Sequence, residues 1–256
     1  MAVAELAARG EVTIRNLSKA YSINGRHLDV LQGVNNHVRS GEILAIVGAS
    51  GSGKTTLLRV LAGLEDADRG EVLIDGRPVH GVGADRAVIF QEPRLLPWLT
   101  VLGNVAFPLE NRGLSRIQAR NQARYYVELV GLGDFTEALP SQLSGGMAQR
   151  VGIARALAVK PEILLLDEPF GALDAMTKIT MQEELYRIWR DEKVTMILVT
   201  HDLEEAVYLA DRVVILSKQK GARTREIDID LPRPRNRSEA RFVRLREQLL
   251  NEFGLH

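Results

Sequence analysis

Directly after an apolar run at residues 43–47, the chain reads Gly48-Ala49-Ser50-Gly51-Ser52-Gly53-Lys54-Thr55, followed by Thr56. This octapeptide matches the pattern G-x-x-x-x-G-K-[ST], and the residues after it have the pattern of a helix that closes at Gly63. A glycine-rich turn between a buried strand and a helix lets backbone amides and the helix N-terminus surround phosphate groups. Lys54 would neutralise the outer phosphates, and Thr55 would offer its hydroxyl to Mg²⁺. The octapeptide therefore predicts a phosphate-binding loop rather than an ordinary glycine-rich turn.

A second apolar run, at residues 163–166, ends in Asp167 and Glu168. A strand that ends in two carboxylates can place Asp167 to hold Mg²⁺ through water and Glu168 beside an attacking water. Taken alone, such a pair could also cap the next turn, and phosphate loops also serve kinases, GTPases and helicases. Together, the loop and the pair predict a site where the terminal phosphate of a nucleotide reacts.

The hydrophobic pattern predicts an α/β fold. Continuous apolar runs at 43–47, 163–166, 194–199 and 213–216 are typical of strands buried on both faces, which predicts a parallel core sheet covered by helices. Near the front of the chain, Val12 and Ile14 alternate with polar residues. Residues 71–74 then run into Asp75-Gly76, a strong hairpin signal, which predicts a small antiparallel β layer.

Helix signals lie between these strands. Ser115 with Gln118 predicts a capping box that opens a helix ending near Gly131, and Asp202 with Glu205 predicts another. A third helix is predicted with one apolar face made of Met181, Leu185, Ile188 and Trp189. The region at about 92–159 is therefore expected to be a mostly helical insertion in the core.

Composition narrows the functional classes. The 256 residues include 33 Lys plus Arg and 33 Asp plus Glu, so no global basic field favours nucleic-acid binding. The absence of cysteine excludes thiolate chemistry and Cys-based metal sites. Residues 1–10 lack the features of a signal peptide and are expected to be a disordered tail. The longest apolar runs are far shorter than the roughly 20 residues of a spanning helix, so a membrane role would be peripheral.

A further motif reads Leu143-Ser144-Gly145-Gly146-Met147-Ala148-Gln149-Arg150. Physically it is a helix start, because Ser144 can cap it and two glycines expose backbone amides to an anion. Met147, Val151, Ala154 and Ala158 would form the apolar stripe behind that end. The motif closely resembles the signature of the ABC ATPases, a family of phosphate-loop NTPases. A merely flexible helix entry would not explain its pairing with a phosphate loop in the same chain.

The resemblance extends from Tyr21 to Arg212 and implies roles for four more residues. Gln91 resembles the glutamine that touches Mg²⁺ and water and senses the permease, and His201 resembles the histidine that contacts the γ-phosphate. Asp174 ends Gly171-Ala172-Leu173-Asp174, which resembles the loop that joins two subunits. Tyr21 resembles the aromatic that stacks on adenine. Taken singly, these could be a surface glutamine, a strand-end histidine, a helix cap and a core aromatic.

The resemblance also implies cofactors and partners. ATP and Mg²⁺ are expected, with Glu168, His201 and Gln91 in catalytic roles, and with Thr55, Gln91 and Asp167 on the metal. Because one phosphate loop and one signature occur, a head-to-tail homodimer is implied, bound to two permease subunits and served by a periplasmic or extracellular solute-binding protein. The ATPase domain would span 11–231, peripheral on the cytoplasmic face of the inner membrane.

The segment after Gln91 bears on the cargo. Residues 95–98, Leu-Leu-Pro-Trp, are expected to be a partly exposed apolar surface where the family receives the permease, although a proline-punctuated core loop is the alternative. The sequence of this segment resembles that of the ATPases of the importer group for nitrate, taurine and aliphatic sulfonates. Met147-Ala148-Gln149-Arg150 favours aliphatic sulfonates, with taurine or nitrate as alternatives.

The C-terminal segment, 232–256, departs from the shared core. It combines a basic stretch with a helix whose apolar face carries Phe242, Leu245, Leu249 and Phe253. A packed terminal helix with a solvated basic edge is favoured over contact with anionic lipid. Two rival functions remain for the whole chain: a non-transport ABC ATPase of translation or DNA repair, and a small-molecule kinase.

Overall fold

A computed structural model describes residues 9–23, 25–171, 173–217 and 224–252. The chain forms two compact units, one comprising residues 1–83 and 192–256 and the other residues 84–191. Apart from Arg9 and Gly10, the expected N-terminal tail lies outside the described residues. No helix in these ranges is both long and apolar enough to cross a lipid bilayer.

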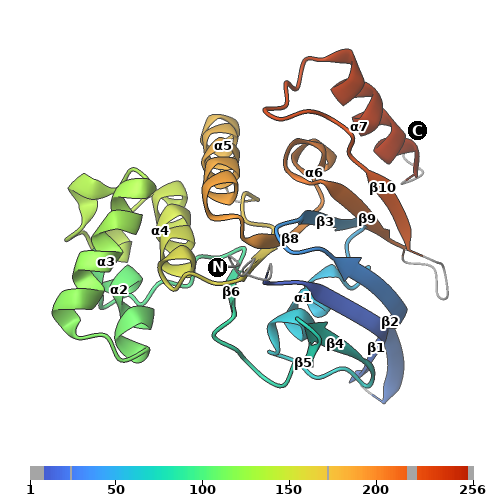
Figure 1. The fold of residues 1–256 in the computed structure, drawn as a ribbon, viewed down its shortest axis with the longest axis horizontal. Helices are drawn as coiled ribbons and strands as arrows, with labels where there is room; N and C mark the ends of the chain where they lie inside the picture. Colours follow the sequence, from blue (N-terminus) through green and yellow to red (C-terminus); the bar gives the residue numbers. More distant parts are fainter. Residues whose placement is uncertain (1–8, 24, 172, 218–223, 253–256) are drawn as a thin grey trace, which may run out of the picture. The chain divides into compact units, whose positions relative to one another are not determined.

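The first unit contains most of the strands. Its elements are β1 (Val12–Ile23), β2 (Arg26–Val38), β3 (Ile43–Gly48), α1 (Lys54–Ala62), β4 (Arg69–Ile74), β5 (Arg77–Pro78), β8 (Thr195–Thr200), α6 (Leu203–Leu209), β9 (Arg212–Leu216), β10 (Arg225–Asp228) and α7 (Ala240–Glu252). Figure 1 shows them in blue to teal and in orange to red.

An antiparallel sheet in the order β2-β1-β4-β5 occupies one side of this unit. The Asp75-Gly76 turn joins β4 to β5, with φ of 48° and 74°, the left-handed geometry that a two-residue hairpin requires. On β1, Val12 and Ile14 are buried. The predicted antiparallel layer is confirmed.

The predicted parallel strands are also confirmed. β3 lies between β8 and β9 and is parallel to both, while β10 pairs antiparallel with β9. Every residue of β3 and of β8 is buried. This burial explains why both strands are continuous apolar runs.

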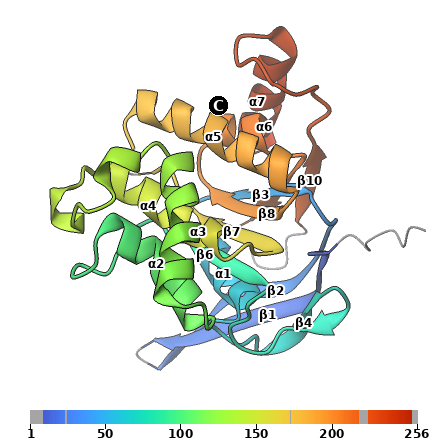
Figure 2. The same ribbon diagram turned by 60° about the vertical axis from the view of Figure 1, so that its left-hand side comes forward.

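The second unit is mostly helical. Its elements are β6 (Arg86–Ile89), α2 (Val101–Asn111), α3 (Arg116–Leu129), two 3₁₀ turns (Gly133–Phe135 and Pro140–Gln142), α4 (Gly145–Ala158), β7 (Ile163–Asp167) and α5 (Ala175–Glu192). Helices α2, α3 and α4 pack against one another (Figure 2). Strands β6 and β7 are parallel. On α5, Met181, Leu185 and Ile188 are buried as predicted.

Capping explains where two helices begin. The capping box of Ser115 and Gln118 is present in full and opens α3 as predicted. Asp202 caps α6 by accepting from the amides of Glu204 and Glu205. The reciprocal half of that predicted box is wrong, because the Asp202 amide donates to Thr200 Oγ1 and the Glu205 carboxylate accepts from the same hydroxyl.

Candidate nucleotide-binding site

The phosphate loop connects β3 to α1 and depends on glycine where its backbone is crowded. Gly53 has φ 94°, and a Cβ there would lie 2.9 Å from the carbonyl oxygen of Val30. A Cβ on Gly48 would lie 2.7 Å from the carbonyl oxygen of Leu216. Any other residue at these two positions would displace backbone, so the turn can close tightly only with glycine.

The interior of this loop suits an anion. Lys54 is buried, and its ammonium donates to the carbonyl oxygens of Gly48 at 2.8 Å and Ala49 at 3.3 Å. The hydroxyl of Ser52 is buried and has no hydrogen-bond partner among the described residues. Ala49, Ser50 and Gly51 form an exposed rim, followed by the exposed Thr55 at the start of α1. A buried cation, an available donor and a helix N-terminus fit a nucleotide phosphate.

Two other predicted residues belong to the same unit. The parallel register pairs Val47 with Thr200, so Gly48 at the end of β3 and His201 directly after β8 lie at the same edge of the sheet. His201 is exposed there. The structure therefore places His201 beside the entry to the phosphate loop.

Tyr21 on β1 is half-buried and joined to the start of α1. Its hydroxyl is hydrogen-bonded to the side chains of Glu65 and Thr56, and the Lys19 ammonium lies 5.7 Å from its ring centroid. Burial raises the pKa of Tyr21, Glu65 raises it further, and Thr56 opposes the shift. These contacts fix a partly exposed aromatic ring next to the helix that the phosphate loop opens.

The second unit holds the predicted carboxylates and the glutamine. The register pairs Ile89 of β6 with Leu166 of β7, so Gln91 and Glu168 follow neighbouring strand ends. A Cβ on Gly171 would lie 3.7 Å from Gln91 Nε2 and 3.9 Å from Glu168 Oε2. Gln91 and Glu168 are thus brought together, next to Asp167 at the end of β7. Glu168 has φ 44°, in the left-handed region that non-glycine residues seldom adopt.

The predicted signature begins α4. Ser144 caps the helix by accepting from the Met147 amide at 3.2 Å, and Ser144 and Gly145 are exposed. Gly146 packs toward the start of α5, where its Cβ would lie 3.2 Å from Thr177 Cγ2. The exposed helix start presents backbone amides to solvent, as an anion site requires.

Asp174 acts as a helix cap in this structure. Its carboxylate accepts from the amides of Met176 at 3.1 Å and Thr177 at 3.0 Å at the start of α5. Hydrogen bonds from Thr177 lower the pKa of Asp174. Ala172, in the same predicted loop, lies outside the described residues.

Three side chains bond the backbone on either side of Gln91: Gln149, which belongs to the predicted signature, and Arg155 and Asn104, which the sequence did not single out. Gln149 Nε2 donates to the Phe90 carbonyl at 3.1 Å, and Arg155 donates to the carbonyls of Pro93 at 2.7 Å and Arg94 at 3.0 Å. Burial lowers the pKa of Arg155. Such contacts with carbonyl oxygens leave no pattern in the sequence, so neither Arg155 nor this contact of Gln149 could be found from it.

Asn104 is the third of these residues. It is fully buried, and its amide bonds the backbone of Leu96, Leu99 and Thr100. The loop at 96–100 thus folds around one side chain of α2. Trp98 on this loop is 72 % exposed, so the alternative that it packs in a core is wrong.

Magnesium would need ligands beyond carboxylates here. Among the described residues, no group of three or more His, Asp or Glu lies close enough to hold a metal ion. Mg²⁺ in nucleotide sites is commonly held by one or two protein groups together with substrate phosphates and waters. Of the predicted ligands, Thr55 lies in the first unit, and Gln91 and Asp167 lie in the second.

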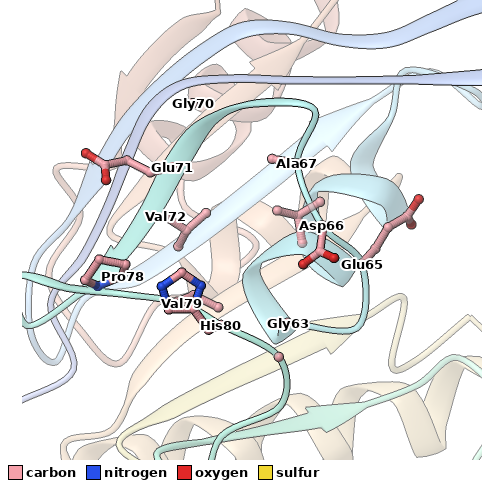
Figure 3. A pocket seen from close by; sticks show the side chains of 12 residues that line it. Gly63, Glu65, Asp66, Ala67, Gly70, Glu71, Val72, Pro78, Val79 and His80 are labelled. Carbon is pink, nitrogen blue, oxygen red and sulfur yellow. The ribbon is translucent and has the colours of Figure 1, made fainter.

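A cavity of about 330 Å³ lies at the far end of α1, beside the β4–β5 hairpin (Figure 3). Glu65, Asp66 and Glu71 line it together with His80. The carboxylates and the C-terminal end of a helix both disfavour an anion. The cavity is therefore unsuited to a triphosphate, which fits the opposite end of α1.

Comparisons with known proteins agree with this geometry. The model of the ABC transporter family matches residues 31–171, more than half of the 256-residue chain. An uncharacterized ABC transporter ATP-binding protein of Methanocaldococcus jannaschii is 48 % identical over 94 % of this chain and 90 % of its own length. A nitrate import ATP-binding protein of Synechocystis sp. is 47 % identical over 88 % of this chain and 86 % of its own length. An aliphatic sulfonates import ATP-binding protein of Bacillus licheniformis is 46 % identical over 94 % of each chain.

Solved structures resemble the fold as well. A dimeric bacterial ABC transporter cassette superposes with a TM-score of 0.78 at 33 % identity, over 86 % of this chain and all of the other. A post-hydrolysis dimer of the same cassette, bound to ADP and Pi, has a TM-score of 0.77 at 32 % identity over the same shares. The α/β architecture predicted from the sequence is confirmed.

Proposed function

The chain belongs to the ABC transporter family, and we propose that it is the ATP-hydrolysing subunit of an importer for aliphatic sulfonates. The observation that carries the ATPase assignment is the presence in one chain of two anion-binding helix starts. One follows the phosphate loop with its buried Lys54, and the other is the exposed start of α4 at Ser144. One phosphate loop surrounds the charge of a γ-phosphate only in part, and a second helix start would add donors for it.

In this proposal the triphosphate lies against residues 48–56. Lys54 neutralises the outer phosphates, the loop amides bind their oxygens, and Tyr21 stacks on the adenine. Mg²⁺, held by Thr55, Gln91 and Asp167, would neutralise charge that develops on the phosphates. Lys54 already points toward the loop interior, which limits the reorganisation needed on binding.

Hydrolysis is assigned to residues at the strand ends. Glu168 orients the attacking water and accepts its proton, Gln91 beside it contacts the same water, and His201 donates to the γ-phosphate. The left-handed backbone at Glu168 is consistent with such a role, because strained conformations are concentrated at functional sites.

We further propose that two chains act as a head-to-tail homodimer. Residues 144–146 of one chain would close the site on the phosphate loop of the other, with residues 171–174 at the joint. A similar solved cassette is described as dimeric, which supports this assembly. ATP would favour the closed dimer, and hydrolysis would release it.

The transport partners follow from the same proposal. Residues 11–231 would form the ATPase domain, with 92–159 as its helical subdomain and 232–256 as a C-terminal addition. Two permease subunits would receive the loop at 95–98, and a periplasmic or extracellular solute-binding protein would deliver the cargo. The chain would then work at the cytoplasmic face of the inner membrane.

The proposal also names a cargo. Relatives named for nitrate and for aliphatic sulfonates are equally similar to this chain, at 47 % and 46 % identity. The motif at 147–150 favours aliphatic sulfonates, and taurine or nitrate is the alternative. The test is ATPase stimulation of the reconstituted transporter by binding proteins loaded with an alkanesulfonate, taurine or nitrate. Stimulation by nitrate alone would overturn the sulfonate assignment.

A further inference from the structure

Four arginines of the C-terminal segment, Arg233, Arg235, Arg237 and Arg246, bond other parts of the chain. Arg233 donates to the carbonyl oxygen of Leu209, the last residue of α6, and to the carboxylate of Asp211, two residues beyond it. Arg246 of α7 reaches Glu204 on α6 at 3.4 Å. Helix α7 packs beside α6 (Figure 1). These four arginines are therefore engaged within the chain, whereas Arg241 and Arg244 are exposed.

Arg235 is the centre of these contacts and is only 8 % exposed. Its guanidinium donates at 2.5 to 3.4 Å to the carbonyl oxygens of Val207, Tyr208, Ala210, Ile229 and Leu231. The last turn of a helix exposes carbonyl groups and carries negative partial charge. A planar guanidinium can serve several such carbonyls at once, whereas a lysine ammonium has only three donors.

The first turn of α6 is held from the same segment. Arg237 lies 3.4 Å from Glu204 and stacks 3.6 Å from the ring centroid of Tyr208. Arg246 binds the same Glu204 carboxylate. Both ends of this short helix are therefore fixed by arginines of the C-terminal segment.

Helix α6 in turn fixes the backbone on both sides of His201. Directly before His201, the Thr200 hydroxyl donates to the buried Glu205 carboxylate of α6 at 2.9 Å. After it, Asp202 accepts from the amides of Glu204 and Glu205. A displacement of α6 would therefore move His201 relative to the phosphate loop.

We propose that residues 231–246 form a clamp on α6 and that Arg235 is a positioning residue for His201. This inference rests on the proposed function, because it assumes that His201 contacts the γ-phosphate. Positioning errors near 1 Å can reduce a rate about a hundredfold without removing substrate binding. The clamp thus gives the C-terminal addition a part in hydrolysis without any contact with the nucleotide.

The test is a double-mutant cycle on kcat for MgATP with Arg235→Lys and His201→Ala. We expect Arg235→Lys to lower kcat about tenfold or more, with KM changed by less than about twofold. In the double variant, kcat should be no lower than in His201→Ala alone, because the clamp acts through that histidine. Arg244→Gln, which removes an exposed arginine from α7, is the matched control and should retain the normal kcat.

The outcomes separate the clamp from the proposed function. If His201→Ala itself leaves kcat unchanged, the catalytic role of His201 fails. If both single variants are slow and their effects on kcat multiply in the double variant, the catalytic role of His201 is supported and the clamp is wrong. Should Arg235→Lys not fold, the variant with Arg237→Gln and Arg246→Gln replaces it in the same cycle. In either clamp variant, amide hydrogen exchange should be faster in α6 than in the unchanged chain, and should stay the same in α2. Unchanged exchange in α6 would also overturn the clamp.

Discussion

At the scale of single residues, the surroundings of Lys54 indicate what its side chain binds. Lys54 is 7 % exposed, and its ammonium donates to carbonyl oxygens at the start of the loop, Gly48 and Ala49. Burying a lysine in this way is costly unless the charge meets compensating groups. Phosphate oxygens would provide stronger compensation than the two carbonyls do.

Lys54→Ala is therefore expected to abolish measurable ATP affinity, because it removes the only side-chain cation of the loop. Equilibrium binding of a fluorescent ATP analogue measures the change, and thermal unfolding without nucleotide checks the fold. Arg59→Ala, which removes an exposed cation from the same helix, should bind ATP normally. Unchanged affinity in Lys54→Ala would exclude the phosphate-loop assignment.

Tyr21 allows a test that separates packing from nucleobase stacking. Tyr21→Ala should weaken ATP binding by about 1–3 kcal/mol, the usual worth of a stacked base, and Tyr21→Phe should weaken it less. Inorganic triphosphate has no base, so its affinity should not change in either variant. Equal losses for ATP and triphosphate would show instead that Tyr21 only supports α1 through Thr56 and Glu65.

At the scale of elements, local and buried features were predictable from the sequence. The strand β3 and the box at Ser115 were predicted because burial on both faces and capping leave patterns over a few residues. β2 was not predicted, because its pairing with β1 shifts register and its burial does not alternate. The contact of Arg235 with Val207 spans 28 residues, so no local pattern reveals it. Asn104 bonds carbonyls only four to eight residues away, but bonds between a side chain and loop backbone have no period that the sequence displays.

The loop at 96–100 carries the prediction that belongs to this scale. Because Asn104 holds its backbone from within, Trp98 can be changed without loss of the loop. Trp98→Asp should leave ATPase activity of the isolated chain normal and abolish uptake with the permease, since a charge would replace an apolar contact. Reconstituted uptake and basal ATPase are the two measurements.

The matched control is Val82→Asp, which puts the same charge at a residue 73 % exposed outside this loop. It should preserve both activities. If Trp98→Asp assembles with the permease and transports at the normal rate, the permease contact lies elsewhere.

At the scale of the whole molecule, each unit carries part of the proposed site. One holds the phosphate loop, Tyr21 and His201, and the other holds the carboxylates and the signature helix. The start of α4 exposes Ser144 and Gly145 to solvent, although its amides are suited to an anion. A second chain would provide that anion as the γ-phosphate in its own loop, so nucleotide and dimer should stabilise each other.

Glu168→Gln tests this linkage together with the catalytic role. The amide keeps the size of the side chain but cannot accept a proton, and loss of a general base slows reactions by about a hundredfold to ten-thousandfold. ATP should then bind and close the dimer without being consumed, so size-exclusion chromatography with MgATP should show dimers that ADP does not produce. Glu137→Gln, at an exposed carboxylate of the same unit, should hydrolyse ATP and elute as the unchanged chain does. A Glu168→Gln variant that stays monomeric and turns over near the normal rate would refute both the general base and the shared site, because each predicts that bound ATP accumulates between two chains.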